Sequence, residues 1–407
     1  MPPSPVPPSP VLPSPVLPSP MLPSPMLLSQ RAQFDVPREV CYMNAASWSP
    51  LPRVSMEAGR AAMARKGQPW TVPPDFAPKQ FECARHAAAR LINAGADDVA
   101  LIPSVSYGVA TAAKLFAPPR NTRVLTLEND HVSPVLEWRT RAAEAGFAVD
   151  AVRQPSDGDW TAALLEAIDR PGAPPASLAS ISAVHWSDGC AIDLGRVAAA
   201  LRRHGAALLI DATHAAGVMQ LDVQTLDADF VVFPTYKWVL GPYGRAFLYV
   251  AKRWQSGVPL EQTGAARQAI SSETAPYLRN LAYVGTARRF DMGERDFFVS
   301  LEMASIGMEM MSLWGAAAIR ERLRMLTNRL ADGLRSTGVQ MQDARLRAPH
   351  ILSLAFPGGM PEGLVDRLAA AQVYAAPRLG RLRISPHVYN DEADVDRCVA
   401  ALREVAR

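Results

Sequence analysis

The sequence predicts an α/β protein in which a mainly parallel β-sheet is covered by helices on both faces. Two patterns carry this prediction: short, continuously apolar runs, and, between them, segments whose apolar residues recur at helical spacing. Continuously apolar strands are typical of sheets that are buried on both faces. With 407 residues, the chain is long enough for a large domain and a smaller one.

The N-terminal residues differ from the rest of the chain in composition. Of the 36 prolines, 12 lie in the first 30 positions, in a repeated Pro-Ser-Pro-Val/Leu/Met pattern. Proline removes backbone donors and favours the polyproline II conformation, so this segment cannot build a packed core. We expect residues 1–31 to form a disordered tail, which is either a dispensable extension or a docking peptide for a proline-recognition domain.

Strand-like runs and helical segments then alternate through a large domain at residues 51–291. One of the helical segments, Leu194–His204, ends at Gly205, a residue that commonly terminates helices. The predicted strands are Val99–Ile102, Arg123–Leu127, Ser180–Val184, Ala207–Ile210, Phe230–Phe233 and Ala246–Val250.

A smaller C-terminal α/β domain is expected at residues 292–407, and residues 32–50 are expected to pack against it. Its predicted elements are a helix at Ile319–Ser336, strands at Ile351–Phe356 and Arg381–Ser385, and a closing helix at Asp391–Arg407.

Composition and charge exclude several classes of protein. The 42 Lys and Arg against 39 Asp and Glu give a net charge of +3, a field too weak to favour nucleic acid or a membrane. There is neither an apolar run of membrane-spanning length nor a basic segment typical of a signal peptide. The cysteines lie far apart without a CxxC pair, so we expect no metal site, no disulfide framework and a cytoplasmic protein. They are Cys41, Cys83, Cys190 and Cys398.

An acid and a lysine follow neighbouring predicted strands. Asp211 ends a strand in LLIDATHAAG, and Lys237 comes just after the next strand in PTYKWVLGPYG. Open α/β sheets bind ligands at the carboxyl ends of their strands. Taken alone, Lys237 fits a surface loop whose aliphatic stem covers aromatic rings, or a desolvated amine that forms a Schiff base with a carbonyl cofactor. Pyridoxal phosphate needs both a lysine and a carboxylate on its pyridine nitrogen, so the pair favours the second interpretation.

The segments IDATHAAGVMQLDV and ADFVVFPTYKWVLGPYGRAFLYV resemble the class V aminotransferase family of fold type I pyridoxal phosphate enzymes. This family includes cysteine desulfurases, isopenicillin N epimerase-like proteins and kynureninase, and the resemblance covers Asp35 to Arg407. It implies a seven-stranded, mainly parallel sheet in the large domain, pyridoxal 5'-phosphate as cofactor, and a homodimer with the active site at the interface. It also implies a small-molecule substrate that is an amino acid.

The resemblance also assigns cofactor contacts by position. Lys237 corresponds to the Schiff-base lysine, which also removes the Cα proton, Asp211 to the partner of the pyridine nitrogen, and His214 to the residue beside the phenolic oxygen. His131, in ENDHVSPVLEW, resembles the histidine that stacks on the ring and relays protons, although a turn or capping role fits it equally.

The phosphate is expected at the start of SVSYGVATAAKLF, where a helix begins after a strand. The resemblance places the Ser106 hydroxyl and the Val105 amide against it, together with Tyr236. Helix capping by Ser104 or Ser106 is compatible with that role.

The substrate side is implied by three further segments. Arg383, in LRISPHVYN, matches the arginine that binds the α-carboxylate. Asn44 and Ala45 resemble the family's N-terminal substrate loop, and Trp48 and Trp186 are expected to line the pocket.

Two departures from the family pattern bear on the reaction. Glu294 stands where relatives carry a threonine that reaches the phosphate across the dimer interface, and the stretch VYAAPRLGRLRISPHVYN lacks the cysteine of desulfurases. The leading hypothesis is therefore C–S β-lysis of a cysteine S-conjugate, as in ergothioneine or lincosamide antibiotic assembly. Transamination, epimerisation, and decarboxylation coupled to oxidative deamination are the alternatives. A catalytically silent binding protein is disfavoured because Asp211, Lys237 and Arg383 are all retained.

Overall fold

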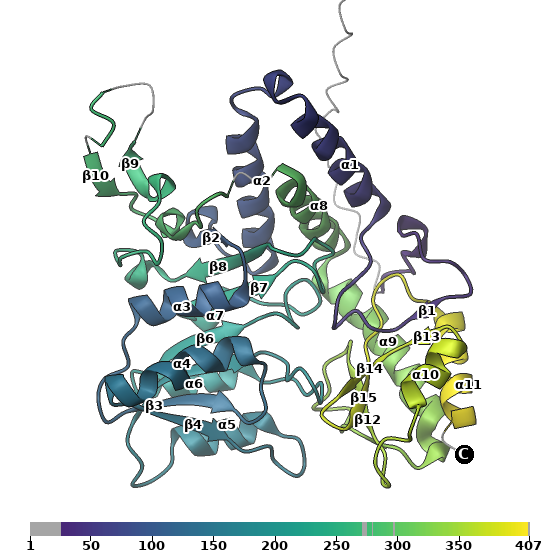
Figure 1. Ribbon diagram of the computed structural model, residues 1–407. Helices are drawn as coiled ribbons and strands as arrows, with labels where there is room; N and C mark the ends of the chain where they lie inside the picture. The colour runs from purple at the N-terminus through teal and green to yellow at the C-terminus, as the bar shows by residue number, and fades with distance from the viewer. Residues whose placement is uncertain (1–25, 271–274, 279, 296–297, 406–407) are drawn as a thin grey trace, which may run out of the picture.

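The computed structural model describes residues 26–270, 275–278, 280–295 and 298–405 (Figure 1). The predicted disordered tail lies outside the described residues as far as residue 25. Its last part contradicts the prediction, because the Leu27 amide donates to the Ala318 carbonyl at 3.3 Å and the Arg31 guanidinium pairs with buried Asp394 at 2.7 Å. A buried acceptor and an apolar surface therefore fix the chain before the predicted end of the tail.

The large domain contains a seven-stranded sheet in which every strand but β8 runs parallel to the others, as predicted. The strand order is β2-β8-β7-β6-β5-β3-β4, so β6 and β7 are central. The strands are β2 (Val99–Ile102), β3 (Arg123–Leu127), β4 (Ala148–Val152), β5 (Ala176–Ser182), β6 (Ala207–Asp211), β7 (Phe230–Pro234) and β8 (Ala246–Val250).

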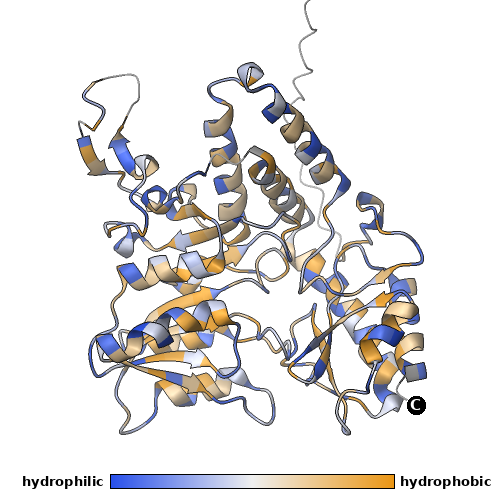
Figure 2. Cartoon of the chain, viewed as in Figure 1, coloured by the Kyte–Doolittle hydropathy of each residue, from blue (hydrophilic) through white to orange (hydrophobic). Residues whose placement is uncertain are grey.

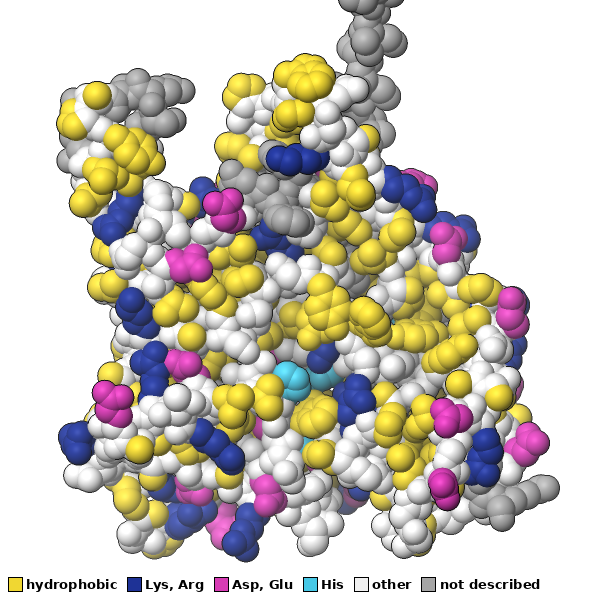
Figure 3. All heavy atoms as spheres, in the orientation of Figure 1, with side chains coloured by type: hydrophobic (Ala, Val, Ile, Leu, Met, Phe, Trp, Pro, Cys, Tyr) yellow, Lys and Arg dark blue, Asp and Glu magenta, His cyan; other side chains and the backbone are white. Residues whose placement is uncertain are grey.

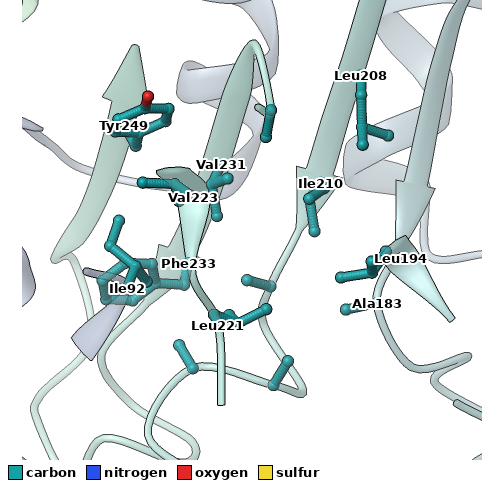
Figure 4. Close-up of a cluster of buried hydrophobic side chains, with 14 of the residues drawn as sticks. Ile92, Ala183, Leu194, Leu208, Ile210, Leu221, Val223, Val231, Phe233 and Tyr249 are labelled. Carbon is teal, nitrogen blue, oxygen red and sulfur yellow. The ribbon is translucent and has the colours of Figure 1, made fainter. Parts of the chain in front are cut away.

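Both faces of this sheet are buried, which explains why its strands are continuously apolar (Figure 2). Along β6, Leu208 and Ile210 point to one face and Leu209 to the other. Figure 4 shows side chains of the first face, including Ile210 and Phe233. Helices α2 (Phe76–Leu91), α5 (Trp160–Ile168), α6 (Leu194–Arg203) and α8 (Phe298–Trp314) cover that face, α3 (Val105–Leu115) and α4 (Val132–Ala145) cover the other, and α7 (Val223–Leu226) packs on α6.

The C-terminal part forms an antiparallel sheet with strand order β11-β12-β15-β14, packed against helices. The N-terminal strand β1 (Cys41–Tyr42) pairs in parallel with β13 (Val373–Tyr374), so residues far apart in sequence lie side by side. The division at residues 291/292 stays a prediction, because α8 packs on α1 (Arg53–Gly67) and α2. The other elements are α9 (Ala316–Leu334), β11 (Gln340–Met341), β12 (Leu352–Ala355), α10 (Leu364–Ala370), β14 (Ala376–Arg378), β15 (Arg381–Ile384) and α11 (Glu392–Val405), with a hairpin of β9 (Arg267–Ala269) and β10 (Asn280–Tyr283) on the large domain.

No helix in the described part of the chain has the length and apolar character needed to cross a membrane.

A buried ion pair fixes α2 to the edge of the large sheet. The side chains of Arg85 and Asp291 are fully buried, with Nη2 and Oδ2 2.8 Å apart, and Asp291 also accepts the Leu101 amide of β2. Removing one partner of such a pair leaves a buried charge uncompensated.

We expect Arg85→Met to lower the free energy of unfolding by about 3 kcal/mol, because it removes one partner of a buried ion pair. The loss is not larger because Arg295 still contacts Asp291. The matched control is Arg90→Met, in the same helix, where the arginine is half-exposed and lies 3.6 Å from Glu309; it should cost less than about 1 kcal/mol. Denaturant unfolding measures both changes. Equal losses would mean that the buried pair contributes no more to the free energy of unfolding than the half-exposed pair does.

Candidate active site

A cavity of about 300 Å³ lies at the carboxyl ends of the parallel strands. The segments after β2, β3, β6 and β7 meet there, because parallel strands end at the same edge of a sheet. On the face shown in Figure 3, histidine side chains lie in a central hollow beside lysine or arginine side chains. All the residues that the sequence analysis assigns to the cofactor line the cavity: Val105, Ser106, His131, Asp211, His214, Tyr236 and Lys237.

Lys237 is buried at one wall of this cavity, with Nζ 3.4 Å from His214 Nε2. Burial lowers the pKa of Lys237 to about 7, and the charge of Arg383 acts in the same direction while that of Asp211 opposes it. The amine is therefore largely neutral at slightly alkaline pH.

The hydrogen bonds around His214 determine its tautomer. The indole of Trp238 is a donor only, and its Nε1 lies 2.9 Å from His214 Nδ1, which must therefore be the acceptor. Burial lowers the pKa of His214 well below its usual value, so the ring is neutral and carries its proton on Nε2. That proton lies on the side of the ring that faces the Lys237 amine.

Asp211 is a buried carboxylate without a cationic partner. It ends β6 with 3% of its surface exposed, and its Oδ1 accepts the Thr213 amide at 2.9 Å. Among the described residues it forms no ion pair, although a buried charge normally has one. A cationic ligand atom in the cavity would complete this site.

Helix α3 points its N-terminus at the opposite end of the cavity. Ser104 caps the helix by accepting the Tyr107 amide, and the amides of Val105 and Ser106 belong to the first turn, which has no acceptors within the helix. The Ser106 hydroxyl donates to Ser133 Oγ at 3.1 Å. Amides, hydroxyls and the helix dipole together favour an anion here.

Two further residues complete this anion-binding end. Tyr236 stacks on Tyr243, with ring centroids 3.8 Å apart. Arg245, which the sequence analysis missed, also lines the cavity, and its Nε donates to Ser300 Oγ at 2.8 Å. The sequence offered one signal for Arg245: it directly follows Gly244, within the segment that resembles the family.

His131 has the capping role weighed from the sequence, and its ring also lines the cavity. It caps α4, with Nδ1 3.4 Å from the Ser133 amide, and its ring lines the cavity edge-on to Trp186. Asp130 holds it in place, because Asp130 Oδ1 accepts hydrogen bonds from the His131 amide and the Ser182 hydroxyl, both at 2.7 Å.

The substrate-side residues do not line this cavity. Arg383 is buried behind it, where Nη1 donates to the Trp186 carbonyl at 2.7 Å and Nη2 to Ser47 Oγ at 3.0 Å. Its Nε has no acceptor among the described residues. Asn44 accepts the Ser47 hydroxyl, so its loop holds the hydroxyl that Arg383 contacts.

The remaining predicted pocket residues do not line the cavity either. Trp48 is 56% exposed and meets Tyr243 edge-on at 5.5 Å, Ala45 is buried, and Trp186 donates to the Asn129 carbonyl at 2.7 Å. Glu294, which stands where relatives carry a threonine, is exposed at a positive φ.

The cavity residues fit pyridoxal phosphate. Asp211 offers the missing counter-charge for a protonated ring nitrogen, the Lys237 amine suits the aldehyde, and the start of α3 with Arg245 suits the phosphate. Within the described residues, no group of three or more His, Cys, Asp or Glu side chains is arranged to hold a metal ion.

The lowered pKa of Lys237 predicts how fast the cofactor-free protein captures pyridoxal phosphate at different pH. Only the neutral amine attacks an aldehyde, so the rate should rise from pH 6 to 8 and then level off, whereas an ordinary lysine keeps gaining rate toward pH 10. Stopped-flow absorbance measures the rate, with Nα-acetyl-lysine as reference for titration of the cofactor itself. A rate that tracks the reference up to pH 10 would contradict the lowered pKa.

Comparison with known proteins agrees with this geometry. A relative from Bacillus subtilis (strain 168), the uncharacterized aminotransferase YcbU, is 26% identical, with 79% of this chain and 82% of that protein covered. The isopenicillin N epimerase of Amycolatopsis lactamdurans is 26% identical, with 93% and 98% covered. The apo structure of a cysteine desulfurase from Thermococcus onnurineus NA1 superposes with a TM-score of 0.80 at 20% identity, covering 92% of this chain and 97% of that one.

The family model for class-V aminotransferases matches residues 74–398, a span that contains every residue lining the cavity. The chain therefore belongs to the class-V aminotransferase family and is a pyridoxal phosphate-dependent enzyme that acts on amino acids.

Proposed function

We propose that this enzyme removes the Cα proton of an amino acid and eliminates a thiol from the β-carbon of a cysteine S-conjugate. The observation that carries the proposal is the buried Lys237 amine, which lies in the cavity beside neutral His214 and has a pKa of about 7. A base with a pKa near the working pH is suited to proton transfer.

Each cavity residue has a part in this proposal. Pyridoxal phosphate, when bound, supplies an electron sink for the charge that develops at Cα. Lys237 takes the Cα proton at Nζ, Asp211 would provide the buried negative charge for the ring nitrogen, and His131 would help to hold the ring. His214, with its proton on Nε2, donates a hydrogen bond toward the Lys237 side of the cavity.

The substrate side favours an amino acid whose carboxylate binds Arg383. Its Nε–H is one of the buried donors that find no acceptor among the described residues, and a planar guanidinium suits a carboxylate. The proposed reaction converts a cysteine S-conjugate and water into a thiol, pyruvate and ammonium. The Cα–H and Cβ–S bonds break, and the sulfur leaves as thiolate and is protonated. The 2-aminoacrylate that is released tautomerises to an imine, and water hydrolyses its C–N bond to give pyruvate and ammonium. No cysteine lines the cavity in the described part of the chain, so a protein thiol that accepts sulfur is not part of the proposal.

Epimerisation is the second candidate, because an isopenicillin N epimerase is similar over 98% of its length. Both reactions begin with loss of the Cα proton. Elimination then breaks the Cβ–S bond, whereas epimerisation returns a proton to the opposite face of Cα.

A substrate panel tests both candidates. Incubating the holoenzyme with L-S-ethylcysteine and other S-conjugates in D2O should release pyruvate and free thiol in equal amounts, and Lys237→Ala should release both about 10³-fold more slowly. Exchange of the Cα hydrogen without pyruvate would reject elimination and favour epimerisation. A cofactor-loaded enzyme that produces neither exchange nor pyruvate would overturn the proposal.

We further propose a homodimer whose interface lies beside the active site. Trp48 and Tyr243 are 56% and 55% exposed at the cavity entrance, and Met63 and Trp70 at the end of α1 are 66% and 80% exposed. Exposed apolar surface of this kind is typical of protein–protein interfaces. Sedimentation velocity tests the proposal, and a monomer with full activity would contradict it.

A further inference from the structure

Two arginines share a single hydroxyl group on the substrate side of the cavity. Arg378 Nη2 lies 2.8 Å and Arg383 Nη2 3.0 Å from Ser47 Oγ. Their other acceptors among the described residues are the carbonyl oxygens of Pro377 and Trp186. Within the described residues, neither guanidinium contacts a carboxylate, although an arginine as buried as Arg383 is normally paired with an acid.

The two like charges destabilise each other. Burial, and to a lesser extent the charge of Arg378, lowers the pKa of Arg383 to about 9. Burial also lowers the pKa of Arg378. Paired cations without an acid partner are typical of sites that receive an anion from outside the chain.

Arg378 also lines a second hollow that adjoins the cavity. This hollow measures about 480 Å³, and His131 lines both it and the cavity. Trp186, Pro377 and Leu379 form apolar walls. The one acid in the lining, Asp130, uses its carboxylate oxygens to accept hydrogen bonds from Ser182 and His131.

We propose that Arg378 binds a second carboxylate of the substrate, so that the enzyme prefers cysteine S-conjugates whose S-substituent ends in a carboxylate. Arg383 then holds the α-carboxylate, and the S-substituent runs past His131 along Trp186 to Arg378. This proposal rests on the proposed function for the identity of the substrate, but the binding site itself does not depend on elimination.

The test uses two ligands that cannot undergo β-elimination. Replacing the sulfur of S-carboxymethylcysteine and of S-ethylcysteine by CH2 gives 2-aminoadipate and norleucine, which differ by one terminal carboxylate. Calorimetry on the holoenzyme should show 2-aminoadipate binding about 10- to 100-fold tighter than norleucine, the range expected for a hydrogen bond between charged groups.

Arg378→Met should abolish that preference and leave norleucine affinity within about threefold. Arg381→Met is the matched control: Arg381 lies on neighbouring β15 and donates to Ser353 Oγ at 2.7 Å, so the preference should persist. Equal affinities for the two ligands in the unmodified enzyme would overturn the proposal. An equal loss of affinity for both ligands in Arg378→Met would also overturn it, because Arg378 would then bind the α-carboxylate or only hold Ser47 in place. Tight 2-aminoadipate binding without pyruvate from S-carboxymethylcysteine would reject β-elimination and leave the Arg378 site standing.

Discussion

Replacing Lys237 with alanine is expected to lower kcat by about 10³-fold, the scale of a lost general base. The same change removes the only amine that lines the cavity within the described residues, so the purified protein should also lose the yellow absorption band of bound pyridoxal phosphate. Turnover of the best S-conjugate and the visible spectrum measure the two effects.

The matched control is Lys252→Ala, which removes an exposed lysine of the same domain and should change neither property. If Lys237→Ala kept the band and a kcat within tenfold of the unmodified enzyme, another group would have to hold the cofactor and take the proton.

Asp211→Asn should lower kcat by about 10²- to 10³-fold. The amide keeps the size of the side chain and its acceptor for the Thr213 amide, but removes the buried negative charge. A buried cation deprived of its partner costs about 3–5 kcal/mol, and each 1.36 kcal/mol in the barrier is tenfold in rate.

A second measurement separates this effect from misfolding. The charge of Asp211 raises the pKa of Lys237, so in Asp211→Asn the pH midpoint of cofactor capture should move down. Asp222→Asn, at the N-cap of α7, is the control that should leave both kcat and the midpoint unchanged. A fall in kcat without the shift would mean that Asp211 acts through structure alone.

The structure gathers the residues predicted for the cofactor in one cavity, whereas the residues predicted for the substrate do not line it. Asp211 and Lys237 could be placed because the end of a strand fixes which edge of the sheet a residue occupies. Arg383 was equally recognisable, but its contact with Ser47 could not be predicted, because Ser47 lies in a loop 336 residues away in the chain.

The same limit applies to residues that act through distant contacts. The support of His131 by Asp130 depends on Ser182, 52 residues later, and no local pattern indicates it. Among the strands, β2, β3 and β8 begin and end as predicted, whereas the edge strand β4 escaped notice because its residues are mostly half-exposed. Burial on both faces produces the clearest strand signal. Strand β2, at the other edge of the sheet, is fully buried and has this signal, whereas β4 is buried only at its last residue.

Borohydride reduction of the cofactor-loaded enzyme, followed by peptide mapping, tests whether Lys237 carries the cofactor. Reduction makes the bond between the lysine and pyridoxal phosphate permanent, so mass spectrometry identifies the residue that carries it. We expect the label on the peptide that contains Lys237, at one per chain, and none in the Lys237→Ala protein. A label on another lysine, or no label in a protein that is folded and saturated with cofactor, would contradict the account.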